Sequence, residues 1–326
     1  MAGLKNQLIS RVEPDLQNIE AALQENLRPH LELISEAAGH LIFSGGKRLR
    51  PLLNILCARL CNYDDPFVTE FSTIIEFLHT ATLLHDDVVD GATLRRGKPV
   101  THSLFGAPVT VLVGDFLLAR ALSIAARTRN PKIIRIISEI TEHMCQGEIQ
   151  QLSRKGDINL QESDYMEVIR CKTGYLIQGA CQTGAILAGA EEETEKQLSD
   201  YGYHIGIVFQ IADDLLDYTA DTSTLGKAVG ADLREGKLTL PVIRALNQAD
   251  GDVRAEMTAI ITKEDFSPAE FHHLVKMIDA HGGIAYAREV AAEHVQAAKT
   301  IMEGFPPSES RELLSLIADY ALHRSA

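Results

Sequence analysis

Two aspartate-rich words, each set inside an apolar helix-forming run, constrain this chain more than any other feature. The first spans Asp86–Asp90 and the second Asp213–Asp217, both with the pattern Asp-Asp-x-x-Asp. Residues four apart share one face of a helix, so the outer aspartates of each word point the same way. Like charges at that spacing weaken a helix, and carboxylates in apolar surroundings are unfavourable unless paired. The two words therefore predict a bound cation.

Oxygen ligands of this kind suit a hard divalent cation. Proteins typically bind Mg²⁺ through one or two carboxylates together with the phosphates of a substrate. The alternative interpretation, a solvated acidic turn, suits a single copy of such a word. Two copies inside apolar helices favour Mg²⁺ as a cofactor.

The rest of the sequence favours an all-α protein. Of its 326 residues, 45% are hydrophobic, which is enough for a substantial core. Good helix formers dominate and the alternating pattern of strands is scarce. The chain has no low-complexity linker and no fixed-period repeat, so we expect a single domain over residues 1–326.

Helical periodicity and flanking prolines place the expected helices. Pro29 closes the first, and Pro66 begins the helix that carries the first aspartate word. Amphipathic helices without chemical motifs follow Pro241. The expected ranges are 4–27, 31–43, 66–89, 110–127, 132–152, 165–187 and 191–218.

The net charge of −14 argues against nucleic acid as a partner, because phosphate contacts need a basic face. Cations nevertheless gather in two short stretches of the sequence. A local basic patch on an acidic protein suggests a small anionic ligand. The two groups are Lys47, Arg48 and Arg50, and Arg95, Arg96 and Lys98.

Cysteine usage and hydropathy indicate a soluble cytoplasmic protein. The five cysteines include no Cys-x-x-Cys pair, and we interpret them as reduced, buried thiols. The N-terminus lacks the basic-then-apolar order of a signal peptide. The most apolar run, Ala107–Ala119, is too short to span a membrane and contains Asp115, so no transmembrane segment is expected.

The stretch Ser44–Pro51 has the composition of an anion-binding loop. Two glycines allow a ligand close to the backbone, and Pro51 suits the start of the next helix. A helix N-terminus beside lysine and arginine attracts phosphate. A solvated basic turn remains the alternative, and the Walker spacing is missing.

Other candidate ligands flank the aspartate words. His79 precedes Asp86 on one helix by about 10 Å along the axis, and contact with a ligand and packing are equally good interpretations. Lys172 interrupts an apolar stretch of sequence, and a lysine among apolar neighbours needs an anionic partner. Lys227 and Lys237 lie in a polar loop after the second word, where ordinary exposed lysines are the alternative.

Together these parts predict a site for a diphosphate leaving group. The sequence has no nucleophile elbow, no His-Glu-x-x-His motif and no Cys/His metal spacing. The economical mechanism is metal-assisted ionisation, in which Mg²⁺, lysine and arginine neutralise the charge that develops on the departing diphosphate. An apolar helical cavity would keep water from the carbocation.

In its motifs, the chain resembles the trans-isoprenyl (polyprenyl) diphosphate synthases from about Gly39 to Pro241. Five words occur in the order of that family, which makes the resemblance specific. They are Gly45–Pro51, Leu83–Asp90 followed by Arg95–Gly97, Lys172–Thr173, Phe209–Asp217 and Asp232–Pro241.

The resemblance implies an all-helical isoprenoid synthase bundle around a deep central cavity, and a homodimer. The enzyme would condense isopentenyl diphosphate head to tail with an allylic diphosphate, farnesyl or shorter. Asp87 and Asp214 would support the metal ligands, and the released diphosphate would take the final proton. The implied Mg²⁺ ligands are Asp86, Asp90, Asp213 and Asp217.

It also implies roles for the other residues. Thr173 and Gln210 would position the allylic part and stabilise its cation, and Phe209 would lie near the alkene of isopentenyl diphosphate. Gln151 departs from the acid that short-chain relatives often have there, so we do not count it as a ligand. The allylic diphosphate would be held by Arg95, Lys172, Lys227 and Lys237, and isopentenyl diphosphate by Lys47, Arg50, His79 and Arg96.

In this family the residues just before the first aspartate word form the floor of the cavity. Here Leu78, Ala81 and Thr82 share one helix face, and the small Ala81 would let the product grow past it. That implies a medium or long product. The sequence around these residues looks most like that of octaprenyl-type synthases, which make quinone side chains. Three bulky residues compete as a lower floor: Phe116, Leu117 and Leu122.

Other functions remain as alternatives. A short-chain farnesyl or geranylgeranyl synthase is the main one, and Ala81 argues against it. A class I terpene cyclase needs no second diphosphate site and usually has a different second word. A non-catalytic partner subunit typically lacks one or both words. A di-iron bundle would need Glu and Glu-x-x-His pairs that the sequence lacks.

Overall fold

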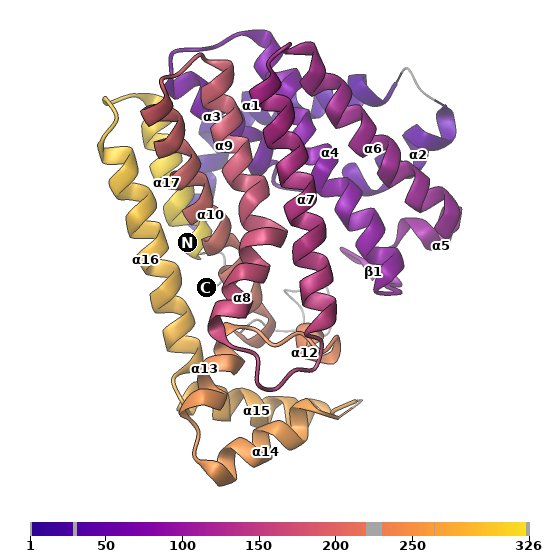
Figure 1. Cartoon of the computed structure of the whole chain (residues 1–326), viewed down its shortest axis with the longest axis vertical. Helices are drawn as coiled ribbons and strands as arrows, with labels where there is room; N and C mark the ends of the chain where they lie inside the picture. The colour runs from indigo at the N-terminus through magenta and orange to yellow at the C-terminus, as the bar shows by residue number, and fades with distance from the viewer. Residues whose placement is uncertain (1, 29–30, 220–229, 264, 324–326) are drawn as a thin grey trace. The chain divides into compact units, whose positions relative to one another are not determined.

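The structure is a computed structural model that describes residues 2–28, 31–219, 230–263 and 265–323. These residues are almost entirely helical, which confirms the prediction of an all-α protein (Figure 1). Within them, strands are confined to one short antiparallel hairpin of β1 (Leu94–Arg95) and β2 (Lys98–Pro99). The hairpin pairs Leu94 with Pro99 and Arg95 with Lys98.

The helices follow the predicted order with small shifts at their ends. They are α1 (Ala2–Leu27), α2 (Glu32–Ile42), α3 (Leu49–Leu60), α4 (Pro66–Val89), α5 (Thr101–Phe105), α6 (Ala107–Arg127), α7 (Pro131–Ser153), α8 (Glu162–Ile169), the π-helix η1 (Arg170–Gly174), α9 (Tyr175–Leu187), α10 (Glu192–Thr219), α12 (Ala231–Arg234), α13 (Leu240–Gln248), α14 (Gly251–Ile261), α15 (Pro268–Ala280), α16 (Gly283–Glu303) and α17 (Glu309–His323). Pro29, the predicted end of the first helix, lies outside the described residues.

Contacts between residues divide the chain into two compact units. The first unit comprises Met1–Glu142, Leu176–Gly202 and Ile301–Ile317, and the second comprises His143–Tyr175, Tyr203–Thr300 and Ala318–Ala326. The first aspartate word belongs to the first unit and the second word to the second unit. The single domain over residues 1–326 therefore stays a prediction.

Helix α4 is the centre of the first unit and coincides with its predicted range. Asp65 caps it by accepting a hydrogen bond from the Phe67 amide at 2.8 Å, and Pro66 occupies its first turn. Its apolar side chains from Phe71 to Leu84 are buried, except for Leu83, which is half-buried. Gly114 of α6 lies against His85, because a Cβ there would come within 2.3 Å of the imidazole. The chain needs glycine at this crossing.

Helix α6 is longer than the apolar run that marks it in the sequence. By length and composition alone it is the one described helix that could cross a membrane, and 39% of its most apolar window is buried inside the protein. One face, including Val113 and Leu117, is buried in the first unit. The opposite face exposes Leu112 and Leu122.

The second unit contains an irregularity that the periodicity does not reveal. The predicted helix from Tyr165 to Leu187 is interrupted by η1, which follows α8 directly. Neighbouring helices approach η1 at glycines. A Cβ on Gly147 would lie 2.8 Å from the Lys172 amide nitrogen, and one on Gly206 would lie 2.7 Å from the Gly174 Cα. These close approaches fit a π-turn, a feature frequently found at functional sites.

The five cysteines are free thiols, as predicted, but not all are buried. Cys57, Cys171 and Cys181 are buried and Cys61 is half-buried, whereas Cys145 is exposed on α7.

A pair of histidines joins α10 to α16 in the second unit. The Nδ1 atoms of His204 and His294 are 2.8 Å apart, and the Tyr203 ring packs beside His294. Burial and the neighbouring His204 lower the pKa of His294 to about 4. An unfolded histidine has a pKa of about 6.5, so between these values the unfolded state binds more protons than the native state. Protonation therefore favours unfolding as the pH falls.

We expect the free energy of unfolding to decrease as the pH falls from about 6.5 to about 4, and His294→Leu to flatten this dependence. Urea denaturation at several pH values measures it. His273→Leu is the matched control, because His273 is an exposed histidine that pairs with Glu256. Equal pH dependence in wild type and His294→Leu would show that this pair does not govern acid stability.

Candidate active site

The first aspartate word ends α4 with its residues facing two ways. Asp87 is 2% exposed, whereas Asp86 and Asp90 are half-buried. Asp87 accepts from Arg95, whose Nε lies 2.9 and 3.1 Å from the two carboxylate oxygens and whose Nη2 lies 2.7 Å from Oδ1. This bidentate pair attaches the β1–β2 hairpin to the end of α4. Asp87 thus supports the word and Arg95 stands directly beside it.

The cations predicted for isopentenyl diphosphate gather in the first unit. Burial, together with the positive charges of Arg50 and Arg96, lowers the pKa of His79 well below its usual value. Burial likewise lowers the pKa of Arg96. The Arg96 guanidinium lies 3.8 Å from the position that a Cβ on Gly46 would occupy, and Lys47 is exposed next to that glycine. Crowded, partly desolvated cations of this kind form a site for an anion.

Arg48 has a structural role that the sequence does not reveal. It is 4% exposed and lies in the left-handed region with φ of 49°. Its guanidinium donates to Glu20 at 2.7 Å, to Glu76 at 2.5 Å and to the Ile42 carbonyl at 2.5 Å. A Cβ on Gly46 would come within 2.9 Å of its Nη1. Arg48 therefore holds the glycine loop in place from inside the first unit.

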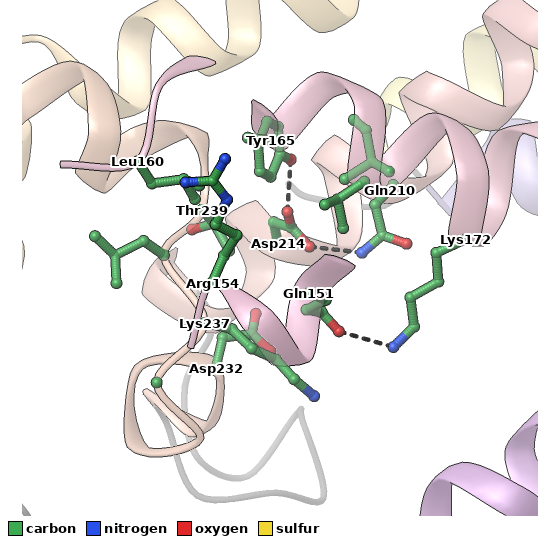
Figure 2. A pocket seen from close by; sticks show the side chains of 14 residues that line it. Gln151, Arg154, Leu160, Tyr165, Lys172, Gln210, Asp214, Asp232, Lys237 and Thr239 are labelled. Atoms are coloured by element: carbon green, nitrogen blue, oxygen red, sulfur yellow. Dashed lines mark hydrogen bonds between the residues drawn. The ribbon is translucent and has the colours of Figure 1, made fainter. Parts of the chain in front are cut away.

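In the second unit, η1 presents Lys172 and Thr173. The ammonium of Lys172 lies 2.5 Å from a Glu148 oxygen. It also donates to Gln151 at 2.9 Å (Figure 2). Both partners are on α7, about one turn apart, so they hold one lysine together. Gln151, which we do not count as a metal ligand because it is an amide, thus helps to position the Lys172 ammonium. Glu148 was not predicted.

The second aspartate word also divides its residues between two environments. Asp213 is exposed, whereas Asp214 and Asp217 are 5% and 7% exposed. Asp217 accepts hydrogen bonds from the backbone amides of Gly230, Ala231 and Asp232, each at 3.1 Å. It therefore ties the first turn of α12 to the end of α10.

Asp214 lies at the centre of a buried hydrogen-bond chain (Figure 2). It accepts from the Tyr165 hydroxyl at 2.6 Å and from the Gln210 amide at 2.7 Å. Thr173 in turn donates to the Gln210 carbonyl oxygen at 2.7 Å. Burial raises the pKa of Asp214 to about 6, although the hydrogen bonds from Tyr165 and Gln210 oppose that shift. The structure thus joins Thr173 to Gln210 and adds Tyr165.

A cavity of about 120 Å³ opens among these residues, and its lining comes entirely from the second unit. Lys172, Gln210 and Asp214 line it together with Asp232 and Lys237 (Figure 2). Burial and the carboxylates of Asp214 and Asp217 raise the pKa of Asp232 to about 8. The lining thus combines these two acidic groups, Asp214 and Asp232, with the cations of Arg154, Lys172 and Lys237.

Of the two lysines predicted in the loop after the second aspartate word, the structure describes one. The Lys237 ammonium lies 2.6 Å from a Glu235 oxygen while its side chain lines the cavity. Lys227 lies outside the described residues.

The carboxylates suit a divalent ion whose coordination shell is completed by the phosphates of a substrate. Among the described residues, no three candidate ligands already converge on one point. Mg²⁺ does not need such a cage, because it commonly takes one or two carboxylates and fills its shell with phosphate and water. Burial, and after it repulsion among the neighbouring carboxylates, raises the Asp214 and Asp232 pKa values, and a cation nearby would offset that repulsion.

The predicted product-length residues lie on one face of α4. Leu78 and Ala81 are fully buried, and Thr82 is half-buried with its hydroxyl donating to the His79 carbonyl. Of the proposed lower-floor residues on α6, Leu117 is buried and Leu122 is 42% exposed, which favours Leu117 over Leu122. In the second unit, Phe209 is 5% exposed on α10.

Comparison with known proteins fits this arrangement. The sequence profile described as "Polyprenyl synthetase" matches residues 31–278. The chain is 37% identical over 310 residues to the octaprenyl diphosphate synthase of Escherichia coli, covering 95% of this chain and 96% of that protein. It is therefore similar to a curated enzyme over nearly its whole length.

Two crystal structures are similar in both sequence and fold. A polyprenyl synthase from Caulobacter crescentus, complexed with calcium and isoprenyl diphosphate, has a TM-score of 0.91 at 38% identity and covers 98% of each chain. A decaprenyl diphosphate synthase from Rhodobacter capsulatus has a TM-score of 0.91 at 37% identity and covers 98% of this chain and 99% of its own. The chain therefore belongs to the polyprenyl synthetase family, and it is a prenyltransferase of the polyprenyl diphosphate synthase type.

Proposed function

We propose that this enzyme condenses isopentenyl diphosphate head to tail with an allylic diphosphate, farnesyl or shorter, in a Mg²⁺-dependent reaction. The observation that carries this proposal is the pair of cations, Arg50 and Arg96, around His79 in the unit that also holds the first aspartate word. An enzyme that only ionises one allylic diphosphate needs no such additional anion site. A condensing enzyme needs one for its second substrate.

The aspartate words supply the oxygen ligands for Mg²⁺ in this proposal. Asp86 and Asp90 act from the first word, and Asp213 and Asp217 from the second. The similar Caulobacter structure holds calcium, another hard divalent cation, with isoprenyl diphosphate. When bound, Mg²⁺ neutralises the negative charge on the departing diphosphate. Asp217 also keeps the α12 turn in place, because its carboxylate already accepts three backbone amides.

The chain's other residues bind and orient the two substrates. Thr173 and Gln210 turn oxygen dipoles toward the allylic cation as its C–O bond breaks. Burial and the surrounding arginines lower the pKa of His79, so it donates a hydrogen bond without adding charge. Phe209 packs near the alkene. Arg95, Lys172, Lys227 and Lys237 bind the allylic diphosphate, and Lys47, Arg50, His79 and Arg96 bind isopentenyl diphosphate.

The covalent step exchanges one bond for another. The allylic C–O bond breaks, and the alkene of isopentenyl diphosphate forms a new C–C bond to the allylic carbon. The resulting cation then loses a proton, which the released diphosphate accepts. An apolar surround that excludes water protects both cations.

We propose a medium or long product of the octaprenyl kind, used for a quinone side chain. Support comes from the small, fully buried Ala81 below Asp86 on α4 and from the long-chain names of the similar enzymes. A short-chain product such as geranylgeranyl diphosphate is the alternative, because identity near 37% leaves chain length open.

We expect Ala81→Phe to shorten the main product toward farnesyl or geranylgeranyl length, because an aromatic ring on this face of α4 would block the growing chain. Chromatography of the dephosphorylated products measures this. Leu83→Phe is the control, since Leu83 is half-buried on α4 but lies off the face shared by Leu78, Ala81 and Thr82. An unchanged product distribution in Ala81→Phe would contradict a tunnel past Ala81.

The proposed assembly is a homodimer in the cytoplasm that makes peripheral membrane contact when it releases its apolar product. The exposed face of α6, with Val111, Leu112 and Leu122, is an apolar surface of the first unit that a second copy of the chain would cover. Light scattering in solution tests the dimer. A monomeric mass at micromolar concentration would contradict it.

Measurement of diphosphate release tests the condensation itself. Protein is incubated with farnesyl diphosphate and Mg²⁺, with or without isopentenyl diphosphate, and a chelator is added in a parallel set. We expect release only when both substrates and Mg²⁺ are present. Release from farnesyl diphosphate alone would instead support a terpene cyclase, and no release in any arm would support a non-catalytic subunit.

A further inference from the structure

The buried chain of hydrogen bonds around Asp214 fixes the orientation of an amide. Gln210 has one donating end and one accepting end of nearly equal size, so its side chain alone does not determine which end faces which neighbour. A carboxylate only accepts. Asp214, 2.7 Å away, therefore selects the NH₂ end of Gln210 and directs its carbonyl oxygen toward Thr173.

Tyr165 completes this selection from the other side of Asp214. Its hydroxyl donates to Oδ2 at 2.6 Å, while Gln210 donates to Oδ1. Tyr165 is 4% exposed and Asp214 is 5% exposed, so solvent does not readily supply a substitute donor. The tyrosine thereby holds the carboxylate in the one rotation that aims Oδ1 at the amide.

At its far end this chain of hydrogen bonds determines where the lone pairs of the Thr173 oxygen point. Thr173 donates its hydroxyl hydrogen to the Gln210 oxygen at 2.7 Å, so the Thr173 oxygen keeps its lone pairs for other contacts. Gln210 and Tyr165 both line the cavity, beside Lys172. Negative dipole ends at this place stabilise a developing cation only if they are held in position before the reaction.

We propose that Tyr165 is a positioning residue, which acts through Asp214 to keep the Gln210 carbonyl oxygen and the Thr173 hydroxyl oxygen aimed at the allylic cation. This rests on the proposed function, which supplies the cation. Tyr165 touches no substrate in this account, so its effect passes entirely through Gln210.

A double-mutant cycle tests this transmission. Tyr165→Phe removes only the hydroxyl, and we expect kcat to fall about tenfold with the KM of both substrates changed less than about twofold. In a Gln210→Ala background the same change is expected to alter kcat less than about twofold, because the amide it orients is gone. An equal loss in both backgrounds, or unchanged kcat in Tyr165→Phe, would overturn the proposal.

The chain offers a matched control for the loss of a buried hydroxyl. Tyr201 is fully buried in the first unit and donates to the Leu314 carbonyl at 2.8 Å. Tyr201→Phe is expected to lower the melting temperature as Tyr165→Phe does while leaving kcat within about twofold of wild type. A fall in kcat in both variants would identify a general effect of stability.

A spectroscopic readout separates this proposal from the condensation reaction. In protein labelled with ¹⁵N-glutamine, Gln210→Ala identifies the side-chain NH₂ resonances of Gln210. Tyr165→Phe is expected to shift these resonances and Tyr201→Phe to leave them in place, without any substrate present. Unshifted resonances in Tyr165→Phe would contradict the positioning role even if the enzyme condenses prenyl diphosphates normally.

Discussion

Replacing Asp86 or Asp213 with alanine is expected to lower kcat about a thousandfold, which corresponds to about 4 kcal/mol of lost transition-state stabilisation. Each change removes an oxygen ligand for Mg²⁺, so charge on the departing diphosphate is no longer neutralised. Stability should change little, because Asp213 is exposed and Asp86 is half-buried. Steady-state kinetics at saturating Mg²⁺ and thermal unfolding measure the two effects separately.

Asp200→Ala is the control for Asp213→Ala. Asp200 lies on the same helix, α10, where it pairs with Lys196 at 2.9 Å. An exposed pair of this kind contributes little, so kcat should stay within about twofold of wild type. If Asp86→Ala or Asp213→Ala retained a tenth of the wild-type kcat or more, the assignment of these residues to the metal would be wrong.

Arg48→Met is expected to lower the free energy of unfolding by about 3–5 kcal/mol, because it leaves the charge of Glu76 buried without its partner. Glu76 is 7% exposed and Arg48 is 4% exposed, so water compensates poorly. The same change releases the glycine loop, and the KM for isopentenyl diphosphate should therefore rise. Urea denaturation and steady-state kinetics measure these effects.

A second substitution shows whether the lost ion pair causes the loss of stability in Arg48→Met. Glu76→Gln in the Arg48→Met background removes the unpaired charge and should recover part of the stability. Arg28→Met is the control, because Arg28 is exposed and forms an exposed ion pair with Glu25, and it should change stability by less than about 0.5 kcal/mol. A loss below about 1 kcal/mol in Arg48→Met would contradict a structural role for the ion pair of Arg48 with Glu76.

Local signals predict most of the helices well. Asp65 and Pro66 mark the start of α4, and its apolar period continues to Val89, so the predicted and observed ranges coincide. The π-turn η1 cannot be predicted from local sequence, because tertiary contacts cause it. It forms where Gly147 and Gly206, on two other helices, approach the backbone around Lys172 and Gly174.

The same distinction holds within the candidate site. The aspartate words are visible as patterns within five residues, and helix geometry separates the buried Asp87 from Asp86 and Asp90. It does not predict that Asp217 is buried while Asp213 is exposed, because the burial of Asp217 comes from the backbone amides of the α12 turn. The supporting contacts join residues far apart in sequence. Glu76 lies 28 residues from Arg48, and Tyr165 lies 49 residues from Asp214. No short pattern connects such partners, so only the folded chain reveals them.

The most direct test of the central claim is the size of the products made from labelled isopentenyl diphosphate, farnesyl diphosphate and Mg²⁺. We predict a ladder of allylic products that ends at about octaprenyl length, with no incorporation when Mg²⁺ is chelated. A ladder ending at geranylgeranyl would keep the chemistry and contradict the open tunnel at Ala81. Absence of any incorporation by the purified, folded protein would contradict the proposed condensation.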